Sequence, residues 1–241
     1  MAHFGVILFM LAFAIALFVL QFPPGFSLGD AVHLAGVTGK WNSIDLSPDL
    51  TKSYTLLSGM LGGFFLALSY FGCDQSQVQR YLAGRSLAES RMSLVLNAFL
   101  KVPMQFLILA AGVLMFVAYH FVQPPLNFSE PDRAVLMQKA GPRYAELETR
   151  YEAVFRARRH AALAMSGARE GGHPVELRRA WEDYARAAEE FREVRAENRA
   201  LLKSVTGTEP SSEVNYVFPS FLIRHAPAGV LGILLAVIFA A

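Results

Sequence analysis

Charge is concentrated in one segment of the chain, and this segregation limits what the sequence can fold into. Residues 130–213 hold 15 of the 22 Lys and Arg residues and 15 of the 20 Asp and Glu residues. The remainder is built around long apolar runs, and hydrophobic residues make up 54% of the whole chain. Runs of about 17 to 25 apolar residues match the length of a helix that crosses a bilayer. The sequence therefore predicts an all-α membrane protein with one polar, nearly neutral insert.

The first apolar run covers residues 4–20 and is stopped by Pro23 and Pro24. A secretory signal peptide is the alternative interpretation, but it needs a basic start and a small-residue cleavage site. The first three residues contain no Lys or Arg. We therefore predict a transmembrane helix over about residues 4–21, followed by a loop of mixed polarity over 26–52.

Two further spans, over about residues 53–73 and 92–121, are joined by a loop over 74–91. The loop carries three arginines, Arg80, Arg85 and Arg91. An excess of basic residues in a short loop indicates the cytoplasmic side of the membrane. This orientation places the charged insert outside, so we expect a multi-pass protein of the cell inner (plasma) membrane with a periplasmic segment over 129–213.

Glycines recur in the second span. Gly59, Gly62 and Gly63 are predicted to let neighbouring helices approach closely, as small residues do in membranes. Gly72 lies at the polar end of the span, where a local break in the helix would expose backbone groups to a solute or an ion.

Lys101 lies inside the third span, nine residues past Met92 and so about 13 Å along the helix axis. A lysine at that depth either snorkels towards the interface or faces a cavity. We favour the cavity, because charged residues within a bilayer are costly and usually functional.

The charged segment over 129–213 predicts a helical hairpin. Apolar and aromatic residues recur at alternating spacings of three and four, and a Gly-rich stretch over 167–174 separates two such series. This pattern is typical of an antiparallel coiled coil. The first series is Tyr144, Leu147, Tyr151 and Val154, and the second is Leu177, Trp181, Tyr184, Ala188, Phe191, Arg195, Asn198 and Leu202.

The last apolar run covers only the 14 residues from Ala228 to Ala241, or about 21 Å as helix, against a hydrocarbon core of about 30 Å. We therefore expect residues 214–241 to form a truncated fourth transmembrane helix and the chain to be a fragment of a longer protein.

Several kinds of site are not predicted. No basic face suggests nucleic acid as a partner. His160 and His173 belong to no cluster with metal-ligand spacing, and Cys73 is the only cysteine. We assign no catalytic residue, no metal ligand within the chain and no cofactor.

Fourteen consecutive residues, 70–83, read Tyr-Phe-Gly-Cys-Asp-Gln-Ser-Gln-Val-Gln-Arg-Tyr-Leu-Ala. They resemble a signature of the sodium/solute symporter family, the family of the sodium–glucose cotransporters. The resemblance covers about residues 4–121 and 216–241. Further matching landmarks are Lys101-Val102-Pro103, Val217-Phe218-Pro219 and Pro227-Ala228-Gly229.

The resemblance implies a fold and a substrate site. The fold is a partial inverted-repeat bundle like that of the leucine transporter, with four hydrophobic spans and the hairpin as an insert. The implied substrate-binding residues are Tyr70, Phe71, Asp74, Gln75 and Lys101. This chain has Ala67 where sugar transporters have Asn, which leaves sialic acid, amino acids, inositol and other small solutes open.

The implied function is sodium-coupled symport of a small organic solute across the cytoplasmic membrane, which is not an enzymatic activity. The implied partners are the lipid bilayer, the solute, the sodium ion as coupling ion, and the missing helices of the same transporter. The alternative is a membrane-embedded sensor or scaffold that acts through the periplasmic hairpin.

Overall fold

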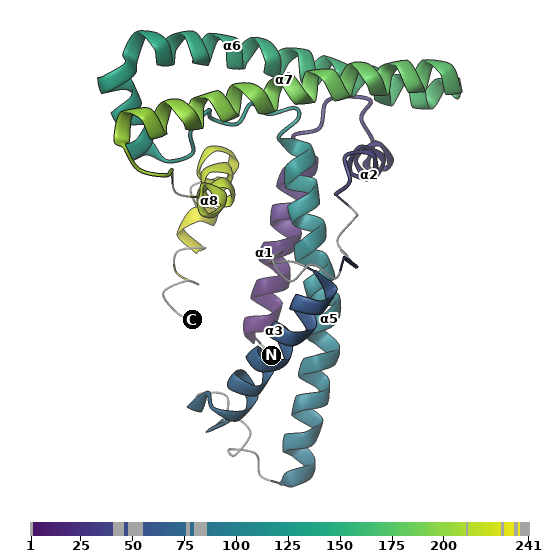
Figure 1. Cartoon of the computed structure of the whole chain (residues 1–241). Coiled ribbons are helices and arrows are strands. Elements are labelled where there is room, and N and C mark those ends of the chain that lie inside the picture. Colours follow the sequence, from purple (N-terminus) through teal and green to yellow (C-terminus); the bar gives the residue numbers. More distant parts are fainter. Residues whose placement is uncertain are drawn as a thin grey trace. The chain divides into compact units, whose positions relative to one another are not determined.

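The computed structural model describes residues 2–40, 46–47, 55–75, 78–79, 86–210, 212–227, 229–233 and 236. The described residues form helices joined by turns and loops and contain no strand, which confirms the prediction of an all-α protein. The helices are α1 (Ala2–Val19), α2 (Leu28–Val37), α3 (Leu56–Gly72), α5 (Leu87–Ala118), α6 (Glu130–Gly171), α7 (Pro174–Thr206) and α8 (Val214–His225) (Figure 1).

The chain divides into two compact units, which are described separately. The first contains residues 1–34 and 114–241, and the second contains residues 35–113. The second unit thus holds α3 and most of α5, whereas the first holds α1, the α6–α7 pair and α8.

In the second unit, α3 begins with a complete cap. The Ser58 backbone N–H donates to Thr55 Oγ1 at 3.2 Å, and the Thr55 N–H donates to Ser58 Oγ at 2.9 Å. Such a capping box satisfies backbone donors that a helix start otherwise leaves free. Within the described part of the chain, a Cβ added at Gly59, Gly62 or Gly63 would meet nothing within 4 Å, so close packing against another helix at these glycines stays a prediction.

Helix α5 is long and largely uncovered by protein. It continues without interruption through Pro103, and only 11% of its most apolar stretch is buried. A helix in the core of a soluble protein would instead be mostly covered, so this apolar surface fits contact with lipid. Of the described helices, α5 is the one long and apolar enough to cross a membrane. The other apolar stretches, at Leu8–Val19, Leu28–Val37 and Leu56–Tyr70, are shorter.

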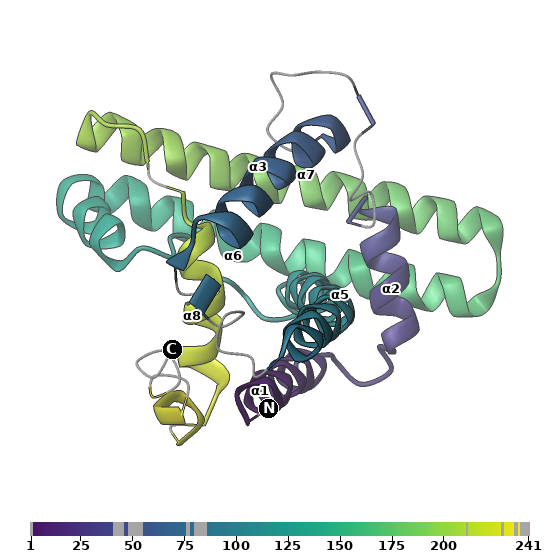
Figure 2. The same cartoon turned by 90° about the horizontal axis from the view of Figure 1, so that it is seen from below.

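In the first unit, α6 and α7 run side by side along their length (Figures 1 and 2). The N-cap Ser129 accepts from the Asp132 N–H, and Pro131 occupies the first turn, where a missing N–H costs nothing. The turn between the helices is shorter than the predicted stretch 167–174, because α6 continues to Gly171. Gly172 then reverses the chain at φ 69°, a left-handed conformation that favours glycine.

The interface between α6 and α7 is close to the predicted stripes but shifts in register. Tyr144, Leu147 and Tyr151 are buried as expected, but Phe155 is the next buried residue, and Val154 is only partly covered. On α7, Ala187 takes the buried place expected for Ala188. The further buried residues along this interface are Arg158, Ala162, Met165, Tyr184, Phe191, Val194, Asn198, Leu201 and Leu202.

Helix α2 lies in the segment predicted to be a loop, so that expectation is wrong. Its start is capped by Ser27 and Asp30. The Asp30 N–H donates to Ser27 Oγ at 3.2 Å, and the Ser27 N–H donates to Asp30 Oδ2 at 2.9 Å. The spacing Ser-x-x-Asp is visible in the sequence and resembles a capping box, which is the signal that could have located this helix.

The expected fourth span is not one continuous helix. Helix α8 ends at His225, and Ala226 adopts an extended conformation with ψ 141° before Pro227. The residue before a proline is disfavoured in the helical region, which explains the break. Helical residues resume at Gly229.

Candidate functional site

The structure brings two of the predicted site residues together. The Nζ atom of Lys101, on α5, lies 5.0 Å from the centroid of the Tyr70 ring, on α3. A cation within about 6 Å of an aromatic face is attracted by the negative charge of that face. The ring therefore holds the ammonium group beside the end of α3, while part of the lysine side chain stays exposed.

The polar residues Asp74 and Gln75 lie directly after the end of α3. The helix ends at Gly72, where the predicted break falls, and the N–H groups of Cys73 and Asp74 both donate to the Ser69 carbonyl, at 3.0 and 3.1 Å. Asp74 is partly buried and Gln75 is exposed. The Phe71 side chain lies outside the described part of the structure, as do Ser76, Gln77 and residues 80–85 of the signature loop.

A lysine ammonium, a tyrosine ring and the polar end of a helix can together recognise a small anion or a hydroxyl-rich solute. The ammonium offers three hydrogen-bond donors and no acceptor, so it selects ligands with oxygen acceptors or negative charge. Among the described residues, no group of three or more His, Cys, Asp or Glu side chains could hold a metal ion.

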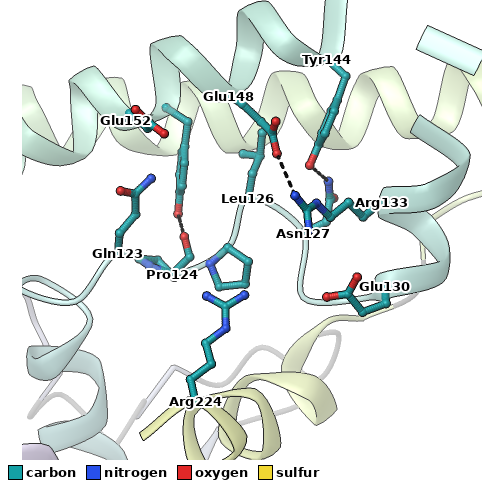
Figure 3. A pocket seen from close by; sticks show the side chains of 12 residues that line it. Gln123, Pro124, Leu126, Asn127, Glu130, Arg133, Tyr144, Glu148, Glu152 and Arg224 are labelled. Carbon is teal, nitrogen blue, oxygen red and sulfur yellow. Dashed lines mark hydrogen bonds and ion pairs between the residues drawn. The ribbon is translucent and has the colours of Figure 1, made fainter. Parts of the chain in front are cut away.

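A second site, which the sequence did not indicate, lies below the hairpin in the first unit. It is a cavity of about 420 Å³ between the link over 123–127, helix α6 and Arg224 of α8 (Figure 3). Its charged lining comprises Glu130, Arg133, Glu148, Glu152 and Arg224. No sequence pattern could have found it, because the contributing segments are about a hundred residues apart.

Buried hydrogen bonds fix the wall of this cavity. The Tyr151 hydroxyl donates to the Pro124 carbonyl at 3.1 Å, and the Asn127 amide donates to the Tyr144 hydroxyl at 3.2 Å. The Asn198 amide, from α7, donates to the Asn127 side-chain oxygen at 2.7 Å. Buried polar groups are costly unless they are paired, so these bonds set the position of the link against the hairpin.

The hairpin also binds the end of α5. Arg158 Nη2 donates to the Tyr119 carbonyl at 2.6 Å. This bond supplies a partner for a carbonyl that the helix end leaves without one. The guanidinium also stacks on Phe191, with 3.7 Å between Arg158 Cζ and the ring centroid. Burial lowers the pKa of Arg158 to about 10.

His120, just after α5, makes a second connection to the hairpin. Its Nε2 accepts from the Tyr184 hydroxyl at 2.7 Å, while its Nδ1 donates to the Phe116 carbonyl at 2.9 Å.

A third tie joins the hairpin to α2. Arg169 Nη1 lies 2.9 Å from Asp30 Oδ1. Burial acts to raise the pKa of Asp30, but hydrogen bonds from Ser27 and the nearby charge of Arg169 outweigh it, so the pKa lies below its usual value. The carboxylate thus remains charged in the fold and serves both as a helix cap and as an anchor for α6.

Alkaline pH is expected to weaken the hairpin through Tyr151. Burial raises the pKa of Tyr151 to about 12, against about 10 in an unfolded chain. The neutral form therefore stabilises the fold, and this contribution is complete below pH 10 and is lost as the pH rises through 12. We expect the free energy of unfolding of the natural chain to fall by about 2 to 3 kcal/mol more over this interval than that of Tyr151→Phe.

Urea unfolding followed by Trp181 fluorescence measures this difference, after Trp41→Phe makes Trp181 the only indole. Loss of the bond to Pro124 lowers the stability of Tyr151→Phe equally at every pH. Only the slope of the free energy of unfolding against pH is therefore diagnostic. If the free energy of unfolding changes with pH in the same way in both proteins, the prediction is wrong.

Comparison with known proteins finds partial similarity to sodium-coupled transporters. The chain is 34% identical to the sodium/iodide cotransporter of Homo sapiens over 97 residues, which are 38% of this chain and 15% of that protein. It is 34% identical to the sodium-dependent multivitamin transporter of Oryctolagus cuniculus over 88 residues, 36% of this chain and 13% of that protein. The third is the sodium-coupled monocarboxylate transporter 1 of Homo sapiens, 34% identical over 59 residues, 24% of this chain and 10% of that protein.

The chain thus spans no more than about 15% of the length of these curated relatives. All three are transporters and none is an enzyme, in agreement with the prediction of a non-enzymatic protein; none is named as a glucose transporter. No family model matches the chain, and no solved structure matches it. The similarity is therefore to sodium-coupled solute transporters over part of the chain.

Proposed function

We propose that this chain takes part in sodium-coupled symport of a small anionic solute across the cell inner membrane. The observation that carries the proposal is the position of Lys101 Nζ, 5.0 Å from the Tyr70 ring centroid, on two helices with largely exposed apolar surfaces. A cation placed among residues that face lipid is costly unless it binds a ligand or a partner. A solute carboxylate or a halide would supply the missing negative charge.

The relatives support this choice of substrate class. Two of the three are named for anions, iodide and monocarboxylates, and all three are named for sodium. Sodium is accordingly the coupling ion in the proposal. The fold proposed for the complete transporter is the inverted-repeat bundle, in which Tyr70, Phe71, Asp74, Gln75 and Lys101 line the substrate path.

An uptake assay tests the proposal. Cells that express the chain in its natural genetic context are compared with cells from which the gene is deleted. We expect radiolabelled lactate or iodide to accumulate only in the expressing cells and only while an inward sodium gradient is maintained. Equal uptake in both strains for both anions would refute the proposed function.

The proposed orientation places the α6–α7 hairpin in the periplasm and residues 74–91 in the cytoplasm. Ala164 is exposed on α6 and Ser86 is exposed before α5, so both can carry a reporter cysteine. Ser166, also on α6, is buried and therefore unsuitable for a reporter cysteine. The exposed Cys73 is first replaced by serine.

A membrane-impermeant maleimide is expected to label Ala164→Cys in intact spheroplasts and to label Ser86→Cys only after the membrane is opened. If only Ser86→Cys is labelled in intact spheroplasts, the orientation is opposite to the proposed one.

One observation favours the second candidate function, a sensor that acts through the hairpin. Arg158 and Tyr184 of the hairpin bind Tyr119 and His120 at the end of α5, so a change in the hairpin can reach a helix proposed to span the membrane. Replacing residues 130–206 by a flexible Gly-Ser linker separates the two functions. A symporter with an accessory hairpin keeps sodium-dependent uptake after this replacement, whereas a sensor shows no uptake in either form.

A further inference from the structure

The cavity below the hairpin has a lining of mixed charge. Three carboxylates and two guanidinium groups reach it, from Glu130, Glu148, Glu152, Arg133 and Arg224. Arg133 and Glu148 already face one another at 3.8 Å, and so largely offset each other. The charges that remain in the lining are those of Glu130, Glu152 and Arg224.

Arg224 approaches the cavity from a different direction than the carboxylates. It extends from α8, whereas Glu148 and Glu152 belong to α6 (Figure 3). Within the described part of the chain, no carboxylate lies within ion-pair distance of Arg224, and no cation lies within that distance of Glu152. The cavity thus presents an uncompensated positive group and an uncompensated negative group on separate elements.

The rest of the lining offers apolar surface between these charges. Pro124, Pro125 and Leu126 line the cavity from the link, and Tyr144 and Tyr151 line it from α6. The Tyr151 hydroxyl is already engaged by Pro124, and the Tyr144 hydroxyl by Asn127. The two rings therefore contribute mainly their carbon faces, and a volume of about 420 Å³ suits a small organic molecule.

From this arrangement we infer that the cavity binds a small zwitterion with an apolar side chain, such as an aliphatic α-amino acid. Arg224 receives the ligand carboxylate, Glu152 receives its ammonium group, and the prolines and tyrosine rings contact the aliphatic part. A simple anion meets an excess of carboxylates here, and a simple cation meets Arg224, so each lacks one of the two ion pairs. This site is separate from the one proposed around Lys101, and its occupancy is measured without any transport.

Three matched probes test the inference by isothermal calorimetry on the purified full chain in detergent micelles. L-Valine carries both charges, 3-methylbutanoate lacks the ammonium group, and isobutylamine lacks the carboxylate. We expect saturable one-to-one binding of L-valine and at least about tenfold weaker binding of the other two, because a charge-assisted hydrogen bond contributes about that factor or more.

Substitutions then assign each ligand group to its residue. Arg224→Gln is expected to weaken L-valine binding about tenfold and to leave the weak binding of isobutylamine unchanged, since isobutylamine has no carboxylate to lose. Glu152→Gln is expected to weaken L-valine similarly and to leave 3-methylbutanoate unchanged. Arg199→Gln and Glu190→Gln, at exposed positions of α7 outside the cavity, are matched controls that should bind L-valine normally.

All four substituted residues are exposed, so the fold should persist, and circular dichroism with Trp181 fluorescence verifies it in each variant. The inference is overturned if L-valine shows no saturable binding, or if 3-methylbutanoate binds as tightly as L-valine. Unchanged L-valine affinity in both Arg224→Gln and Glu152→Gln would overturn it as well.

Discussion

Phe191→Ala is expected to lower the free energy of unfolding of the hairpin by about 3 to 5 kcal/mol, the usual cost of removing a phenylalanine from a packed core. Phe191 is only 5% exposed, and its ring centroid lies 5.1 Å from that of Tyr151 and 6.4 Å from that of Phe155. The substitution also removes the aromatic face on which the buried guanidinium of Arg158 is stacked. Small domains have only about 5 to 15 kcal/mol of stability, so the loss should be a large fraction of the total.

Urea unfolding of the full chain with Trp41→Phe, in micelles, measures this effect when it is followed by the fluorescence of Trp181. That indole belongs to α7 and lies 5.7 Å from the Tyr184 ring, so it reports on the hairpin. Phe99→Ala is the control, because Phe99 is 75% exposed on α5 and contributes little to any protein core. An unchanged urea midpoint in Phe191→Ala would show that the packing around Arg158 does not hold the two helices together.

Lys101→Ala is expected to raise the half-saturating concentration for anion uptake by about 10- to 100-fold. A hydrogen bond to a charged group contributes about 1.5 to 3 kcal/mol, and each 1.4 kcal/mol is a factor of ten. Insertion into the membrane should be unaffected, since removing a charge from an apolar helix makes insertion easier. The measurement is sodium-driven uptake at several anion concentrations, normalised to the amount of protein in the membrane.

Related variants separate recognition from packing. Lys101→Arg keeps the positive charge and should retain most of the uptake, whereas Tyr70→Leu removes the ring face that holds the ammonium group. Arg91→Ala is the control, because Arg91 is an exposed basic residue near the start of the same helix. Normal uptake by Lys101→Ala would mean that this lysine only snorkels to the membrane surface.

Short-range patterns predicted the helical content well, and the places where they failed have identifiable reasons. The helix α2 was missed because it is only 10 residues long and contains Gly29 and Gly36, which disfavour a helix, although Ser27 and Asp30 mark its start. The spacing along α6 predicted Val154 as the next buried position after Tyr151, but the antiparallel partner buries Phe155 instead. A regular spacing does not determine which of two adjacent apolar residues faces the partner, because that depends on the rotation of both helices.

The two candidate sites also differ in whether the sequence alone could locate them. Lys101 and Tyr70 both belong to the substrate site that the family resemblance implies. They lie on consecutive spans joined by a short loop, which tend to pack against each other, and the 5.0 Å separation agrees with this. The cavity below the hairpin depends on Arg224 and Glu152, which come from α8 and α6. Nothing local in the sequence relates two residues that are so far apart along the chain, so this site required the structure.

The bond from Arg158 to the Tyr119 carbonyl has a consequence for the order of events during synthesis. The two residues are 39 positions apart, so the end of α5 leaves the ribosome well before the group that completes its hydrogen bonding. Until α6 has formed, the last carbonyls of α5 depend on water. The end of α5 and the hairpin should therefore become ordered in one step, and amide hydrogen exchange at residues 119–122 should slow only when the amides of α7 also become protected.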